Sequence, residues 1–156
     1  MTDQDRNRID GYLKFLKSTF RFLLWTGVGL IVIGVLIGLT TNGTHYFSLS
    51  PGFTFIGVVL TIRSIYEGQR IPLAHQLGDR AYFNVEVNDL VSKIKFFSLF
   101  LILAVMACIV VGFVIQWRFL IPTLVVLVLY VVSEYIIWTI IRFRLVLLKQ
   151  ELKIEE

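Results

Sequence analysis

Two ionisable residues, Arg63 and Glu134, stand in long apolar runs of this 156-residue chain, and they are the residues best placed to do chemistry. An ionisable side chain inside a bilayer is costly, so it usually faces a helix bundle, a wet cavity or a partner. Arg63 lies twelve positions after Pro51, and Glu134 lies twelve positions after Pro122. If both prolines begin helices at one membrane surface, the two side chains reach the same depth, roughly 18 Å below it. The spacing therefore predicts an ion pair between Arg63 and Glu134.

Two aromatic residues belong to the same candidate site. Tyr130 and Trp138 lie one helical turn before and after Glu134, so the three side chains share a helix face with polar tips. Three roles for Glu134 remain open: a structural ion pair with Arg63, which we favour, a proton or cation relay, and a carboxyl group that opens to cytoplasmic water.

Small residues form two further patterns that are typical of helix packing in lipid. Gly34 and Gly38 make a GxxxG motif, and Ala104, Cys108 and Gly112 follow one another at intervals of four. Such stripes allow helix backbones to approach closely. They predict either packing within one chain or assembly of several chains.

Other chemistry is not indicated by the sequence. Cys108 is the only cysteine, which excludes an intramolecular disulfide, a CxxC pair and a cysteine zinc site. His45 and His75 fall on opposite sides of the membrane in the topology below, so they cannot share a metal. No phosphate loop, nucleophile elbow or nucleic-acid module occurs. We therefore expect no cofactor, no metal, no nucleic-acid partner and no enzymatic activity.

The elements that must position these residues are membrane helices. Hydrophobic residues make up 56% of the chain, the mean hydropathy is +0.78 and only 17% of residues are charged. A helix needs about 20 apolar residues to cross the hydrocarbon, and backbone in lipid must be helical to satisfy its hydrogen bonds. Four segments qualify: Phe20–Thr40, Pro51–Tyr66, Phe96–Gln116 and Leu120–Ile141. The predicted fold is an all-α bundle of four transmembrane helices in one domain, residues 1–156.

Basic residues predict the orientation of this bundle. The outer loop Thr41–Ser50 has no lysine or arginine, and the turn Gln116–Phe119 has only Arg118. Most basic residues lie in three other segments. The N-terminal arm (1–19) and the start of the first span hold Arg6, Arg8, Lys14, Lys17 and Arg21; the middle loop (67–95) holds Arg70, Arg80, Lys93 and Lys95; and the tail (142–156) holds Arg142, Arg144, Lys149 and Lys153. We therefore expect both termini and the middle loop in the cytoplasm, with the chain folded as two helical hairpins.

Local signals place some helix ends. Ser50 and Pro51 are typical of a helix start, and Asn88 or Asp89 is the expected cap of the third helix. The stretch Tyr12–Phe22 is either a basic helix at the membrane interface or a simple extension of the first span.

These features favour a non-enzymatic protein of a cell membrane, most simply the bacterial inner membrane. It would act through helix–helix or partner-protein contacts, as a membrane anchor, an accessory subunit or an immunity or defence component, alone or as a homo-oligomer. The alternative is a small oligomeric channel or a proton- or cation-coupled transporter that uses Glu134.

Overall fold

The computed structural model describes residues 3–41, 49–114 and 117–152, with the side chains of 107–109, 111–114, 117–120 and 122–123 outside the description. Its described elements are helical: α1 (Asp3–Thr40), α2 (Leu49–Gln69), the short 3₁₀ helix η2 (Gln76–Gly78), α3 (Arg80–Val114) and α4 (Trp117–Glu151). The prediction of an all-α fold is confirmed.

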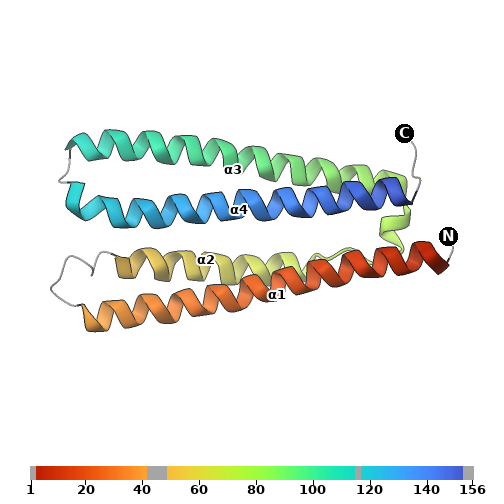
Figure 1. The fold of residues 1–156 in the computed structure, drawn as a ribbon, viewed down its shortest axis with the longest axis horizontal. Coiled ribbons are helices and arrows are strands. Elements are labelled where there is room, and N and C mark those ends of the chain that lie inside the picture. Colours follow the sequence, from red (N-terminus) through yellow and green to blue (C-terminus); the bar gives the residue numbers. More distant parts are fainter. Residues whose placement is uncertain (1–2, 42–48, 115–116, 153–156) are drawn as a thin grey trace.

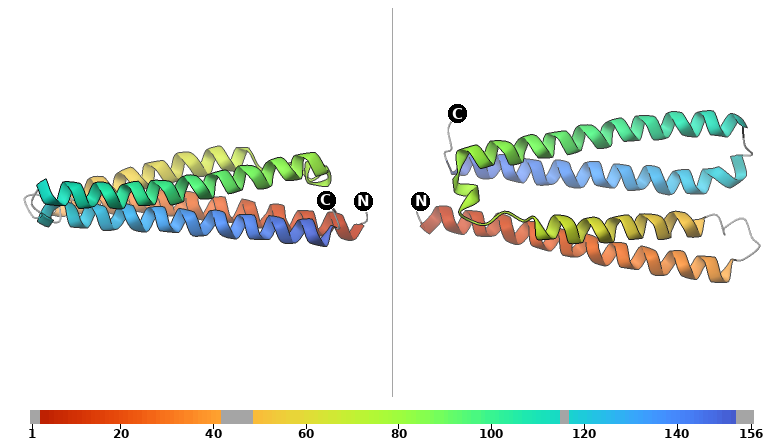
Figure 2. Two further views of the ribbon diagram at one scale, coloured as in Figure 1. Left: turned by 90° about the horizontal axis from the view of Figure 1, so that it is seen from above. Right: turned by 180° about the vertical axis from the view of Figure 1, so that it is seen from behind.

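The helices form two antiparallel hairpins, α1 with α2 and α3 with α4 (Figure 1). The hairpins meet mainly where α4 packs against α1 and α2, and the right-hand view of Figure 2 shows them side by side from behind. Asp3 and Glu151 lie at the same end of the molecule, together with η2 (Figure 1). We call this end the terminal end.

Three helices are long and apolar enough to cross a membrane: α1, α2 and the part of α4 from Leu124 to Glu151. The chain therefore has the helices of a membrane protein. The apolar run Phe96–Gln116 includes residues outside the description, as does most of the loop Thr41–Ser50, so a fourth crossing stays a prediction.

The segment between α2 and α3 differs from the prediction. We expected a loop over 67–95, but α2 continues to Gln69 and α3 already begins at Arg80. The expected cap at Asn88 or Asp89 is wrong, because Asp79 performs this role: the Ala81 backbone N–H donates to Asp79 Oδ1 at 2.9 Å. An aspartate at this position satisfies a free N–H group of the first turn.

The N-terminal arm is not a separate segment, because α1 is one continuous helix from Asp3 to Thr40. Of the two interpretations of Tyr12–Phe22, the structure has the extension of the first span. The first part of α1, η2, the start of α3 and the end of α4 together form a charged helical extension of the bundle at the terminal end.

The hydrophobic core of the bundle continues into this extension. Ile9, Leu77, Phe83 and Leu145 are each 0% exposed, and they belong to the same hydrophobic cluster as the residues of the apolar runs. Many side chains of the apolar runs face outward instead, such as Leu39 at 74% exposure. This is the pattern expected of helices whose outer faces contact lipid, while charged segments must bury their apolar side chains against one another.

Candidate functional site

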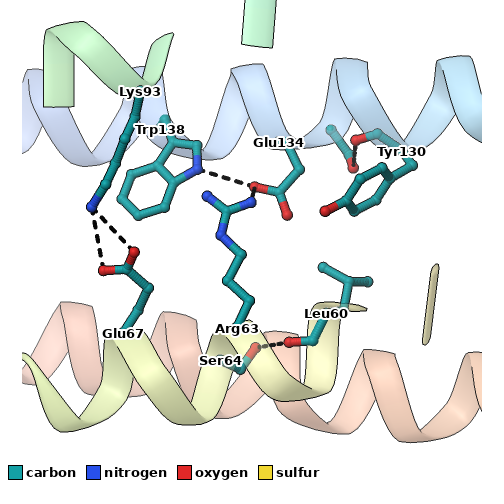
Figure 3. A network of polar contacts seen from close by, with 9 residues as sticks. Leu60, Arg63, Ser64, Glu67, Lys93, Tyr130, Glu134 and Trp138 are labelled. Atoms are coloured by element: carbon teal, nitrogen blue, oxygen red, sulfur yellow. Dashed lines mark hydrogen bonds and ion pairs between the residues drawn. The ribbon is translucent and has the colours of Figure 1, made fainter. Parts of the chain in front are cut away.

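The structure brings Arg63 and Glu134 together. Arg63 extends from α2 to α4, and its Nη1 lies 2.7 Å from Glu134 Oε2 (Figure 3). The Glu134 side chain is 2% exposed and that of Arg63 is 21% exposed. The two charges lie together as predicted, but Pro122 does not begin its helix: α4 already begins at Trp117, whereas α2 begins at Leu49, two residues before Pro51. The ion pair links the first hairpin to the second.

Trp138 contacts both members of this pair. Its Nε1–H donates to Glu134 Oε2 at 3.1 Å, and the Arg63 guanidinium lies 4.8 Å from the centre of its ring. The same guanidinium lies 4.8 Å from the ring centre of Phe97 in α3. Phe20 of α1 packs against Trp138 with ring centres 6.4 Å apart. All four long helices therefore contribute a side chain to this layer.

A second cation, Lys93, adjoins the indole of Trp138. Lys93 Nζ lies 4.6 Å from the ring centre and 3.1 Å from Glu67 Oε1 (Figure 3). It also lies 2.8 Å from Asp89 Oδ2. Cations are attracted to the negative face of an indole, so Arg63 and Lys93 both stabilise its position. The sequence prediction placed Lys93 in the basic segment 67–95, on a helix expected to begin at Asn88 or Asp89, and assigned it no contact. The signal that could have found this contact is the Asp89–Lys93 spacing of four, which is typical of a helical ion pair.

Tyr130, the remaining predicted member of the site, lies on the other side of Glu134 along α4 (Figure 3). Figure 3 shows its hydroxyl directed toward Glu134 Oε1, the carboxylate oxygen that does not contact Arg63. That oxygen is buried and has no hydrogen-bond partner among the described residues. A buried acceptor without a donor is costly, so a small rotation of Tyr130 would be favourable.

Two apolar cavities border this layer on the side away from the terminal end. One, of about 240 Å³, lies between α4 and the first hairpin, where Leu30, Phe53 and Leu129 belong to its wall. The other, of about 220 Å³, is lined by Phe55, Phe100 and neighbouring apolar side chains. Tyr130 lines both cavities, whereas Glu134 lines neither. Apolar walls of this kind do not hold a chain of water molecules that would lead to the carboxylate.

The glycines of α1 lie against α2. A Cβ atom on Gly34 would overlap Thr54 Oγ1 and lie 2.7 Å from Thr54 N, and one on Gly38 would lie 2.7 Å from Ser50 Oγ. Ser50 Oγ–H also donates to the Gly34 carbonyl at 2.8 Å. Gly27 meets Gly57 in the same way, since its Cβ would lie 2.9 Å from the Gly57 carbonyl. In this chain, the GxxxG motif packs the first hairpin.

The second stripe is only partly described. Ala104 is buried, at 9% exposure, whereas the side-chain surroundings of Cys108 and Gly112 lie outside the described residues. Whether this stripe packs within the chain or between chains stays a prediction.

Within the described residues, no three His, Cys, Asp or Glu side chains come close enough to hold a metal ion. No family model, curated protein or solved structure matches the chain. The functional argument therefore rests on the geometry of the polar layer and of the extension.

Proposed function

We propose that this chain is a four-span protein of the bacterial inner membrane that acts through contacts with a partner protein or a second copy, without catalysis. Both termini lie in the cytoplasm in this proposal. It is supported by the strong bias of lysine and arginine toward the terminal end and by the position of Asp3, η2 and Glu151 at that same end.

The observation that carries the proposal is the closed state of Glu134. An intramembrane carboxylate that moves ions must exchange with water, but this one pairs with Arg63 at 2.7 Å, accepts from Trp138 and is 2% exposed. The neighbouring cavities are apolar. Such a network favours a structural role, because removing either charge would leave the other unpaired in a medium of low dielectric.

The extension at the terminal end supplies the contact surface. It has a well-packed core, so it can present a rigid surface to a partner. It also exposes large apolar side chains outside the apolar runs, with Leu73 at 60% and Val85 at 65% exposure. Membrane anchors, accessory subunits and immunity or defence components all need a surface of this kind.

A second candidate is a small oligomeric channel or proton- or cation-coupled transporter. One observation favours it: Glu134 Oε1 is buried without a hydrogen-bond partner among the described residues, and the Tyr130 hydroxyl is directed toward it. A proton held there would satisfy both groups. Transport would require an aqueous path that opens on another assembly of the chain.

Crosslinking and flux distinguish the two candidates. A photoreactive amino acid at Leu73 or Val85 should give a discrete protein adduct in cells, whereas the same group at Leu39, an exposed apolar position at the other end of α1, should not. In parallel, liposomes that contain the wild-type chain should show no proton flux above empty liposomes. Proton flux that Glu134→Gln abolishes, together with no adduct at Leu73 or Val85, would establish the transporter instead.

A further inference from the structure

A cavity of about 290 Å³ opens between the start of α1 and the end of α4, separate from the polar layer around Glu134. Its wall includes Arg8, Tyr12 and Phe15 of α1 and Arg144 and Glu151 of α4. The volume is close to the lower end of that found for small-molecule sites, ~300 Å³. Polar and apolar groups share the wall, unlike the two cavities within the apolar runs.

The charges in this wall favour an anion. Arg8 and Arg144 approach the cavity from opposite helices, and Glu151 is the one carboxylate among the lining residues. Arg144 has no ion pair within the described part of the chain, and its guanidinium lies 5.4 Å from the ring centre of Phe15. The aromatic ring therefore restrains a guanidinium group that has no acidic partner among those residues.

Arg8 is held at the opposite side of the cavity. Its Nη1 donates to the Glu151 backbone carbonyl at 2.7 Å, while its Nε lies 3.8 Å from Glu151 Oε2. The second contact is long, and the two side chains are 36% and 55% exposed. Ion pairs of this kind contribute little, so a more strongly charged anion can compete with the Glu151 carboxylate.

We propose that this cavity binds a phosphate group, carried by an anionic phospholipid headgroup or by a free phosphate compound. Guanidinium groups bind phosphate through paired hydrogen bonds, and two of them face this space. In the proposed topology, Arg144 lies three residues past Ile141, roughly 4.5 Å beyond the end of the apolar run. That is the level of the phospholipid headgroups. The cavity continues from there toward the cytoplasm along Arg8 and Glu151.

The test uses the full-length chain in detergent and two probes, phosphatidylglycerol with a fluorescent acyl chain and inorganic pyrophosphate. Phosphatidylcholine with the same label is the neutral reference. Whichever of the two probes binds the wild-type chain, Arg144→Gln should weaken its binding about tenfold, as expected for the loss of charged hydrogen bonds. Glu151→Gln should strengthen binding, because it removes the competing carboxylate.

Arg142→Gln is the matched control, since it removes the same charge from the same helix at an exposed position that does not line the cavity. It should change binding less than twofold. Specific binding of phosphatidylglycerol without displacement by pyrophosphate assigns the site to a lipid headgroup, and binding of pyrophosphate with the same variant pattern assigns it to a free phosphate compound. Equal losses for Arg142→Gln and Arg144→Gln, or no probe bound above phosphatidylcholine, would overturn the proposal.

Discussion

Glu134 has two partners in the structure, since it pairs with Arg63 and accepts a hydrogen bond from the Trp138 N–H. In an apolar environment, the free energy of a buried ion pair depends on both partners being present, because desolvation offsets much of their attraction. The indole adds a constraint on geometry, since it donates to the carboxylate and packs against both Arg63 and Lys93. At the scale of single residues, the polar layer therefore holds the two hairpins together.

The ion pair predicts non-additive effects on stability. Glu134→Gln should lower the free energy of unfolding by about 3–5 kcal/mol, because it leaves Arg63 unpaired. Adding Arg63→Met should recover part of this loss. Unfolding in mixed micelles with increasing concentrations of denaturing detergent measures the free energies of unfolding for this double-mutant cycle. Glu151→Gln, which touches only an exposed pair, should cost less than about 1 kcal/mol. Strict additivity of the first two substitutions would show that the two charges do not interact.

Glu86, in the extension, predicts a dependence of stability on pH. Burial raises the pKa of this carboxyl above its ordinary value of 4.5, and the nearby carboxylates Asp89 and Glu67 act in the same direction, while Lys93 opposes them. The folded chain thus holds the proton more tightly than the unfolded chain. This contribution to stability is fully present below the unfolded pKa and is lost as pH rises through the folded pKa.

The melting temperature should therefore rise as pH falls from neutrality toward 4.5, and Glu86→Gln should raise it at neutral pH and flatten this part of the profile. Melting followed by near-ultraviolet circular dichroism in detergent measures both effects. Asp10→Asn, a change at an exposed carboxyl of α1, serves as the control. A profile that Glu86→Gln leaves unchanged would assign the dependence to other groups.

The sequence predicted part of this site for a simple reason. Depth in a straight helix follows from the count of residues, so equal distances from Pro51 and Pro122 placed Arg63 beside Glu134. Lys93 could not be placed in this way, because its helix was expected to begin at Asn88 or Asp89. Only the fold shows that Lys93 reaches across to Glu67 and stands against Trp138.

At the scale of elements, the buried positions of α4 have one period throughout. Val131, Glu134, Trp138, Ile141 and Leu145 are buried at alternating intervals of three and four residues. This is the spacing of knobs-into-holes packing, and it passes from the apolar run into the charged tail without a break. The helices therefore pack by one geometry in both environments.

The same period explains what the sequence did not reveal about α3. Phe83, Leu90 and Phe97 are buried at intervals of seven, with Val87 and Ile94 partly buried between them. Read as a heptad, the pattern predicts a helix that starts well before Asn88. The charges among these residues are typical of a loop, and the cap at Asp79 lies nine or ten residues before the predicted ones. Packing, rather than local polarity, decides where this helix begins.

The close contact of α1 with α2 predicts a strict size limit at Gly34. Gly34→Ala should lower the free energy of unfolding by about 1–3 kcal/mol, since its methyl group overlaps Thr54 and the surrounding backbone cannot easily move. Gly29→Ala in the same helix should stay within about 0.5 kcal/mol, because nothing lies within 4 Å of the added atom. Detergent unfolding ranks the two variants, and equal losses would contradict the close approach.

At the scale of the whole molecule, the positive charges and the extension coincide. The basic arm, the segment 70–79 and the tail come together at one end of the bundle. Cytoplasmic segments of membrane proteins are enriched in lysine and arginine, so this coincidence gives both hairpins the same orientation. In this proposed orientation, the extension and the cavity lined by Arg8 and Arg144 face the cytoplasm, and the polar layer lies within the nearer part of the bilayer.

This orientation predicts which positions a membrane-impermeant thiol reagent can reach in intact cells. With Cys108 replaced by serine, single cysteines at Gly43 and Arg118 should react, although Gly43 and the Arg118 side chain lie outside the described residues. Cysteines at Gln76 and Gln150 should not react. Because the Gln76 side chain accepts a hydrogen bond from the Leu73 N–H at 3.0 Å, the adjacent exposed His75 is the sharper probe of this segment. Permeabilised cells provide the control, since cysteines placed at His75 and Gln150 must then react fully with the reagent. If a cysteine at His75 reacts in intact cells, η2 lies outside the cell. That result would overturn the proposed orientation, and with it the cytoplasmic contact surface and the position of Arg144 at the level of the headgroups.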